Sequence, residues 1–334
     1  MSDGARPDDA GDWLAAAFAP GALGDAFQPV RELGRGGMGV VVLVRERALH
    51  RTVAVKFLRP SLAGSPRAVD RFAREARIQA QLEHPGVVPL HATGAVTVGA
   101  LGAEGGGPPA RLPYLVMRYV AGASLARTLD ARAAAGAGPL AADVTRRFLG
   151  ELADVLAFAH GRGVVHRDLK PENVLLEQTA PPGDALGRAL LTDFGVAALP
   201  SHDDPRTADH AAGTPRYMAP EQLAGEHAVD GRTDVYALGA IGLALLTGRR
   251  PYADHATAAV AAAHLAAPVP DVAALAPDAP RDLCRAVARC LAKDPAARWP
   301  TAAAFGAALG AQLGDGGAAR PSLWARLRAG RRGG

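Results

Sequence analysis

The glycine-rich stretch LGRGGMGVVVLV, residues 33–44, constrains the fold more than any other part of the sequence. Gly34, Gly36 and Gly39 have the spacing G-x-G-x-x-G, which lets backbone amides approach phosphate groups with no Cβ in the way. The same spacing opens dinucleotide-binding units, but there the third glycine leads into a helix. Here a run of β-branched residues follows Gly39, so we predict a phosphate-binding turn between two strands.

The hydrophobic patterning predicts a small β-rich part followed by a larger helical part. Alternating apolar residues indicate three antiparallel strands within about 29–58, and an amphipathic helix follows over 67–82. A further strand is expected at 114–120, and helical patterning dominates from about residue 125. The longest apolar run, 235–247, is shorter than the ~20 residues that cross a bilayer, and it predicts a buried core helix. The fold class is therefore α+β.

Composition places the chain among soluble globular proteins, with 49% hydrophobic and 21% charged residues. A net charge of +4 without clustering gives no reason to expect nucleic acid as a partner. Cys284 and Cys290 have no Cys or His companions at metal-ligand spacing, so we expect two reduced, packed thiols. The acidic N-terminus does not resemble a signal peptide, and we expect a cytoplasmic protein.

Lysine is rare in this chain, since only Lys56, Lys170 and Lys293 occur among 37 basic residues. Lys56 ends the apolar strand VAVK, where a buried ammonium is costly unless it meets anions. Nucleotide phosphates and one carboxylate would supply them, and Glu75 on the amphipathic helix is the obvious candidate. Lys293 lies near a predicted helix end and receives no catalytic role.

The stretch HRDLKPEN, residues 166–173, ends in the only asparagine of the chain. Its Asp168 is suited to accept a proton from a hydroxyl nucleophile, and Lys170 to neutralise charge on a transferring phosphoryl group. The amide oxygen of Asn173 suits a Mg²⁺ ion, which prefers oxygen ligands. Asp193, in LLTDFG, would add a second oxygen ligand.

The ordered motifs GRGGMGVV, VAVK, HRDLKPEN, DFG and APE (219–221) resemble the protein kinase signature set. The similarity is to bacterial Ser/Thr protein kinases of the eukaryotic-like type. It implies a two-lobed protein kinase fold, with a small β-rich N-lobe that carries one helix and a larger, mainly helical C-lobe. The implied division is, in chain order, a loosely ordered leader (1–27), the kinase domain (28–312) made of N-lobe (about 28–117), hinge (about 118–123) and C-lobe (about 124–312), and a Gly/Arg-rich basic tail (313–334).

The resemblance also implies that the protein uses ATP and Mg²⁺, with Mn²⁺ as an alternative. Lys56 would hold the α- and β-phosphates and pair with Glu75, Asp168 would deprotonate the substrate hydroxyl, and Lys170 would contact the γ-phosphate. Asn173 and Asp193 would bind the metal. The implied ATP-binding residues are Leu33, Gly34, Arg35, Gly36, Gly37, Met38, Gly39, Val41, Ala54, Lys56, Met117 (the gatekeeper beside adenine), Arg118 and Val120 (hydrogen-bonding backbone groups).

Two residues favour Ser/Thr over Tyr as the acceptor by the same resemblance. Lys170 follows HRDL directly, and Thr214 in GTPRYMAPE lies where its hydroxyl would bond Asp168 and Lys170. Arg167 would receive a phosphate on the activation segment. Among the acceptors there, Ser201, Thr207 and Thr214, we predict Thr207 as the site of autophosphorylation.

Three further residues are expected to have structural roles in the family. Asp234 would bond the backbone of the catalytic loop, and Arg298 would pair with Glu221. Gln79 departs from the family, which often has an apolar residue there that packs toward Phe194. We therefore expect a less firmly seated helix and lower basal activity before phosphorylation.

The leading hypothesis is an ATP- and Mg-dependent protein Ser/Thr kinase. The alternative is a pseudokinase-like ATP-binding regulatory module, and a small-molecule phosphotransferase is disfavoured by the peptide-groove segment GTPRYMAPE. The expected partners are proteins with Ser/Thr acceptors and a second copy of the chain for autophosphorylation. The basic tail is interpreted as solvated in preference to membrane-bound, because so short a helix is marginal in isolation.

Overall fold

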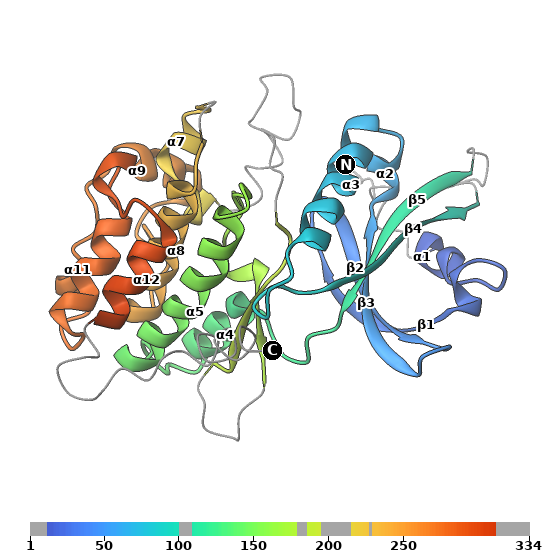
Figure 1. Ribbon diagram of the computed structural model, residues 1–334, viewed down its shortest axis with the longest axis horizontal. Helices are drawn as coiled ribbons and strands as arrows, with labels where there is room; N and C mark the ends of the chain where they lie inside the picture. The colour runs from blue at the N-terminus through green and yellow to red at the C-terminus, as the bar shows by residue number, and fades with distance from the viewer. Residues whose placement is uncertain (1–11, 100–108, 179–185, 195–214, 227–228, 312–334) are drawn as a thin grey trace, which may run out of the picture. The chain divides into compact units, whose positions relative to one another are not determined.

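The computed structural model describes residues 12–99, 109–178, 186–194, 215–226 and 229–311 (Figure 1). These residues group into two compact units, each described separately below. The sheet unit comprises the described residues up to Thr128 together with those from Arg162 to Pro215. The helical unit comprises Leu129–Gly161 and the described residues from Arg216 onward. The lobe boundaries expected from the sequence stay a prediction.

The sheet unit is built on one antiparallel sheet in the order β1-β2-β3-β5-β4 (Figure 1). Its helices and strands, with a separate two-stranded hairpin β6-β7, are α1 (Asp12–Ala17), β1 (Phe27–Arg35), β2 (Gly39–Glu46), β3 (Arg51–Leu58), α2 (Pro60–Ala63), α3 (Pro66–Gln81), β4 (Leu90–Val98), β5 (Ala110–Arg118), β6 (Val174–Glu177) and β7 (Arg188–Leu191). The expected three strands and amphipathic helix are confirmed.

Alternation along the strands gives the sheet two different apolar faces. Val40, Val42 and Val44 of β2 are buried in one hydrophobic cluster, whereas α3 packs in a second cluster that includes Leu115 and Met117 of β5. Successive strand residues point to opposite faces, so the two clusters lie on the two sides of the sheet. Helix α3 thereby covers the face that carries Lys56.

The leader differs from the loosely ordered segment expected over 1–27. From Asp12 onward it forms helix α1 and packs on the face of the sheet opposite to α3. Trp13 is 3% exposed, and its ring contacts the Phe57 ring edge-on with 5.9 Å between the ring centroids. The ring of Phe18 also contacts the Phe57 ring edge-on, at 5.6 Å. Burial of these aromatic rings against β3 gives the order that so short a helix lacks by itself. Residues 1–11 lie outside the described part of the chain.

The helical unit packs around α8, whose residues from Thr233 to Leu246 are all buried. This confirms the core helix expected at 235–247. Its helices are α4 (Leu125–Ala134, which begins in the sheet unit), α5 (Ala142–His160), α7 (Pro220–Leu223), α8 (Arg232–Thr247), α9 (Val260–Ala266), α10 (Val272–Leu275), α11 (Arg281–Cys290) and α12 (Ala302–Ala311). Within the described residues, no helix has the length and apolarity needed to cross a membrane.

Close contact between α8 and α11 depends on a glycine. A Cβ at Gly239 would lie 2.4 Å from the Cβ of Cys290, so a larger residue there would force the two helices apart. Cys284 and Cys290, both on α11, are free and buried thiols. They are packing residues, as the sequence predicted.

Candidate active site

The strand register brings the expected nucleotide-binding residues onto one face of the sheet. Val41 on β2 lies opposite Lys56 on β3, and Ala54 lies opposite Met117 on β5. Residues two apart on a strand share a face, so Lys56 and Ala54 lie side by side. This face therefore presents an apolar surface, made by Val41, Ala54 and Met117, beside one ammonium group.

The glycine-rich turn has open space over its backbone. Gly36 donates its amide hydrogen to the carbonyl of Gly39 at 2.9 Å and so closes the hairpin between β1 and β2. A Cβ placed on Gly34, Gly36 or Gly37 would meet nothing within 4 Å, whereas one on Gly39 would lie 2.1 Å from the Phe57 carbonyl oxygen. Gly39 is thus required by packing, and the other three leave room for a ligand. Leu33, Arg35 and Met38 lie in this turn region and are at most partly buried.

The segment after β5 is fastened to the hairpin β6-β7. Arg118 donates its amide hydrogen to the Pro89 carbonyl at 2.9 Å, and Val120 is buried. Gly122 approaches β6 so closely that a Cβ would lie 1.8 Å from the Leu176 carbonyl oxygen. This contact fixes the path of the predicted hinge.

Glu177 is a buried acidic residue that sequence reasoning missed. Its carboxylate accepts from Arg118 on one oxygen and from Arg188, at 2.6 Å, on the other. It ties the side chain of Arg118 to the β6-β7 hairpin. No motif marks Glu177, and only the pairing of distant strands brings the two arginines to it.

Lys56 meets two carboxylates at once. Its Nζ lies 2.6 Å from Glu75 Oε1 on α3 and 2.9 Å from Asp193 Oδ1, which follows β7. Lys56 is 7% and Glu75 4% exposed, so both groups are held away from water. The expected pair of Lys56 with Glu75 is present, and Asp193 joins it.

Burial and charge shift the three groups in different directions. Burial raises the pKa of Glu75 to about 7, although Lys56 opposes the rise. Burial would also raise the pKa of Asp193, but the Lys56 ammonium outweighs it and holds that pKa below the usual range. Burial would lower the pKa of Lys56, yet the charges of Asp193 and Glu75 raise it. Lys56 is therefore a permanent cation between carboxylates of unequal basicity.

Asp168 is held by two other residues of its own motif. Lys170 Nζ lies 2.9 and 2.8 Å from the two carboxylate oxygens, and Asn173 Nδ2 donates to the Asp168 carbonyl at 2.8 Å and to Oδ2 at 3.0 Å. Asn173 belongs to a short 3₁₀ turn, Pro171–Asn173, that leads into β6. The Asp168 side chain remains 40% exposed, so a hydroxyl group can reach it.

His166 is a second residue that sequence reasoning did not single out. It is fully buried, accepts from the Asp168 amide through Nδ1 at 3.3 Å, and has Nε2 3.2 Å from the Thr192 carbonyl. An accepting Nδ1 implies that Nε2 carries the proton and donates it. His166 thus joins the loop of Asp168 to the residue before Asp193. The sequence signal that could have identified His166 is its position as the first residue of the motif HRDLKPEN.

The backbone at both loops is unusual. Arg167 has φ 63° and Asp193 has φ 56°, values in the left-handed region that non-glycine residues seldom adopt. Such conformations persist only where surrounding contacts impose them, and they concentrate at functional sites.

Oxygen donors for a hard metal ion are present at this place. The Asn173 amide nitrogen is used as a donor, so its oxygen is left to accept, and Asp193 uses only Oδ1 toward Lys56. The Thr192 amide donates to the Asn173 carbonyl at 3.1 Å, which keeps the two segments adjacent. An amide oxygen and a carboxylate oxygen suit Mg²⁺ or Mn²⁺. The donor set fits the metal that the sequence led us to expect.

Glu221, Asp234 and Arg298 lie in the helical unit. Arg298 Nη1 and Nη2 bond the two oxygens of Glu221, each at 2.7 Å, and Thr233 donates to Glu221 Oε1 at 2.7 Å. Burial would raise the pKa of Glu221, but Arg298 holds it below the usual range. Asp234 Oδ2 lies 2.8 Å from Nε2 of His160. Ser201, Thr207 and Thr214 lie outside the described residues.

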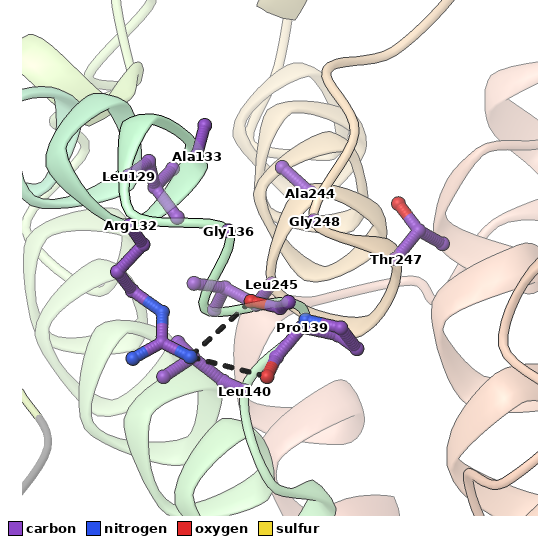
Figure 2. Close-up of a pocket in the computed structure, with 11 residues that line it drawn as sticks. Leu129, Arg132, Ala133, Gly136, Pro139, Leu140, Ala244, Leu245, Thr247 and Gly248 are labelled. Atoms are coloured by element: carbon purple, nitrogen blue, oxygen red, sulfur yellow. Dashed lines mark hydrogen bonds between the residues drawn. The ribbon is translucent and has the colours of Figure 1, made fainter.

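A cavity of about 330 Å³ lies in the helical unit, between the ends of α4 and α8 (Figure 2). Its one charged lining residue, Arg132, donates to the carbonyls of Ala137, Gly138 and Pro139. These hydrogen bonds hold the segment that follows α4, residues 137–139, against the Arg132 side chain. The lining residues include no carboxylate, histidine or lysine, and the Arg132 guanidinium is already bonded to backbone carbonyls, so we place the candidate active site in the sheet unit.

The chain is similar to known proteins. The family model of the protein kinase domain matches residues 27–307. Serine/threonine-protein kinase Pkn1 of Myxococcus xanthus is 40% identical over 291 residues, which are 87% of this chain and 38% of Pkn1. Serine/threonine-protein kinase PknB of Mycobacterium tuberculosis is 35% identical over 287 residues, which are 85% of this chain and 42% of PknB.

The fold is also similar to solved structures. The crystal structure of the Mycobacterium tuberculosis PknI kinase domain superposes with a TM-score of 0.62 at 30% identity, covering 86% of this chain and 96% of that domain. The chain thus spans nearly all of that domain, but only about two fifths of the length of the curated relatives Pkn1 and PknB.

Proposed function

Because the chain belongs to the protein kinase domain family, we propose that it transfers the γ-phosphoryl group of ATP to serine and threonine hydroxyls of proteins. One observation carries the proposal. Lys56 bonds both Glu75 and Asp193, and the Asp168 carboxylate bonds the ammonium group of Lys170. Phosphoryl transfer needs little covalent help from a protein and depends on such positioned charges.

Each group has a defined task in the proposed reaction. The sheet face with Val41, Ala54 and Met117 receives the adenine, and Lys56 binds the α- and β-phosphates. Asp168 orients the substrate hydroxyl and accepts its proton, while Lys170 neutralises charge on the γ-phosphate. Asn173 and Asp193 hold a divalent ion, which neutralises charge on the phosphate oxygens when bound.

Protein substrates and autophosphorylation are part of the proposal. Thr207 remains the proposed site of autophosphorylation, with Arg167 as the partner of its phosphate. A second copy of the chain is proposed to catalyse the transfer of the γ-phosphoryl group from ATP to Thr207. Mixing tagged Asp168→Asn protein with the untagged wild type tests both points. We expect mass spectrometry to find phosphate on Thr207 of the tagged protein, and its absence there would contradict transfer between copies.

The proposal is tested with purified protein, γ-labelled ATP, Mg²⁺ and a generic basic protein substrate. Wild type is expected to incorporate label, whereas Asp168→Asn and Lys56→Met remain at background. If wild type matches these variants even after pre-incubation with ATP, the kinase proposal fails. Nucleotide binding without transfer would instead support the alternative of an ATP-binding regulatory module.

A further inference from the structure

Gln79 occupies an unusual place for a polar side chain. It is only 2% exposed, on the buried face of α3 one turn after Glu75. Its Nε2 donates to the Val88 carbonyl at 2.8 Å and lies 3.8 Å from the Met117 sulfur. The sequence led us to expect a less firmly seated helix and lower basal activity before phosphorylation. The structure differs, because the Gln79 amide donates to the buried backbone carbonyl of Val88. No sequence motif predicts this hydrogen bond.

Val88 bonds in two directions. Its carbonyl accepts from Gln79, and its amide donates to the Leu191 carbonyl at 2.9 Å. Leu191 in turn donates to the Gly86 carbonyl at 2.7 Å, and Val87 bridges Leu191 in parallel fashion. The short segment 86–88 therefore pairs with the end of β7 through an isolated β-bridge. Asp193 follows that end by two residues.

Helix α3, the hydrogen bond from Gln79 to Val88 and the hydrogen bond from Val88 to Leu191 thus connect the two carboxylates that flank Lys56. Glu75 and Gln79 are four residues apart and share one face of α3. Gln79 fixes that face to Val88, and Val88 fixes the end of β7, which carries Asp193. A shift of α3 along its axis would break the Gln79 bond and leave the Val88 carbonyl buried without a donor.

Within the described part of the chain, the oxygen atom of the Gln79 side-chain amide, Oε1, adds no hydrogen bond that would stabilise the fold. Oε1 is buried, and none of the described residues donates to it. An unsatisfied buried acceptor has a free-energy cost that an apolar side chain of the same size would avoid. The contribution of Gln79 is therefore expected in alignment of the site rather than in overall stability.

We propose that Gln79 is a positioning residue that holds Glu75 and Asp193 in register around Lys56 through Val88, before any phosphorylation of the activation segment. The inference rests on the proposed kinase function, since it is the phosphoryl-transfer site that Gln79 aligns. It predicts a substantial basal activity, because α3 is held inward by a bond that needs no phosphate.

The test compares Gln79→Met with Gln81→Met, the same change at an exposed position of the same helix. Both variants and wild type are treated with phosphatase before assay. For Gln79→Met we expect kcat to fall about tenfold, as loss of one buried hydrogen bond allows, with KM for ATP little changed. Its melting temperature stays near that of wild type, and Gln81→Met behaves as wild type throughout.

Hydrogen exchange gives a readout that does not depend on activity. In Gln79→Met, amide exchange is expected to accelerate both in α3 and in the segment 186–194, because the path through Val88 is cut. Faster exchange in α3 alone, or an unchanged kcat, would overturn the proposal. If wild type transfers no phosphate, the kinase function fails, and the exchange in segment 186–194 still decides whether Gln79 couples the two segments.

Discussion

Glu75 Oε1 lies 2.6 Å from Lys56 Nζ, with 9% of the Lys56 and 6% of the Glu75 side chain exposed, although the two residues are 19 positions apart on a helix and a strand. Asp193 approaches the same ammonium group from a third segment. Removal of Lys56 would leave two buried carboxylates without their cation, whereas loss of the charge on Glu75 leaves Lys56 with Asp193 as its one anionic partner among these three groups. The chemistry of this site is therefore sensitive to the ionisation of Glu75.

Activity is expected to fall as pH decreases through about 7, the pKa to which burial raises Glu75. Below that pH Glu75 takes up a proton and Lys56 keeps only Asp193 as an anionic partner. The pH dependence of kcat/KM for ATP measures this ionisation in the free enzyme. Glu75→Gln is expected to be weakly active and to lose this limb of the profile. A profile of Glu75→Gln parallel to that of wild type would show that another group titrates.

Stability is expected to change in the opposite direction over the same pH range. The folded pKa of Glu75, about 7, lies above its ordinary value of 4.5. This group therefore contributes stability that is fully present below pH 4.5 and is lost as pH rises through 7. Urea unfolding at several pH values measures the slope, which Glu75→Gln should reduce. An equal slope in wild type and Glu75→Gln would contradict the raised pKa.

Substitution of Asn173 is expected to raise the Mg²⁺ concentration needed for half-maximal activity by about tenfold or more, a range typical of lost contacts around a metal. Asn173→Ala removes the proposed oxygen ligand and both hydrogen bonds to Asp168. Asn173→Asp keeps an oxygen but places a carboxylate against that of Asp168. Initial rates measured against Mg²⁺ at fixed ATP test this. Unchanged metal dependence in both variants would exclude Asn173 as a ligand.

Glu221→Ala is expected to lower the free energy of unfolding by about 3–5 kcal/mol, because it leaves a buried guanidinium unpaired. The side chain of Arg298 is 0% exposed and bonds Glu221 in bidentate fashion. Asp254→Ala provides the matched control, because its ion pair with Arg249 is exposed and such pairs contribute below about 1 kcal/mol. Chemical denaturation compares the two. Equal losses would argue against a special role of the buried pair.

Trp13→Ala is expected to destabilise the protein by about 3–5 kcal/mol, as deletion of a buried aromatic ring does. Trp13 packs against Phe57 in the hydrophobic cluster on the face of the sheet opposite to α3. Leu49→Ala, at a position 59% exposed in the same unit, should stay within about 0.5 kcal/mol of wild type. Thermal unfolding measures both. Kinase activity well below the melting temperature should persist in Trp13→Ala, and its loss there would indicate a direct role.

The sequence allowed much of the molecule to be predicted, because its motifs are local. The strands around Gly39, the helix with Glu75 and the buried helix 235–247 follow from spacing and apolar period, and the structure confirms them. The predicted protein kinase fold is confirmed by the family match and the PknI similarity. The order of α1 was not predictable, since a six-residue helix becomes stable only through packing against β3.

The sequence by itself determined which chemical groups are available: three lysines, one asparagine, and the carboxylates Glu75, Asp168 and Asp193 in their motifs. Only the tertiary structure decided how those groups are held. Glu177 between two arginines, His166 between two loops, and Gln79 against the Val88 carbonyl all depend on contacts between segments far apart in the chain or on different elements. A hydrogen bond requires a partner within about 3 Å, and side-chain spacing along a sequence does not specify that distance.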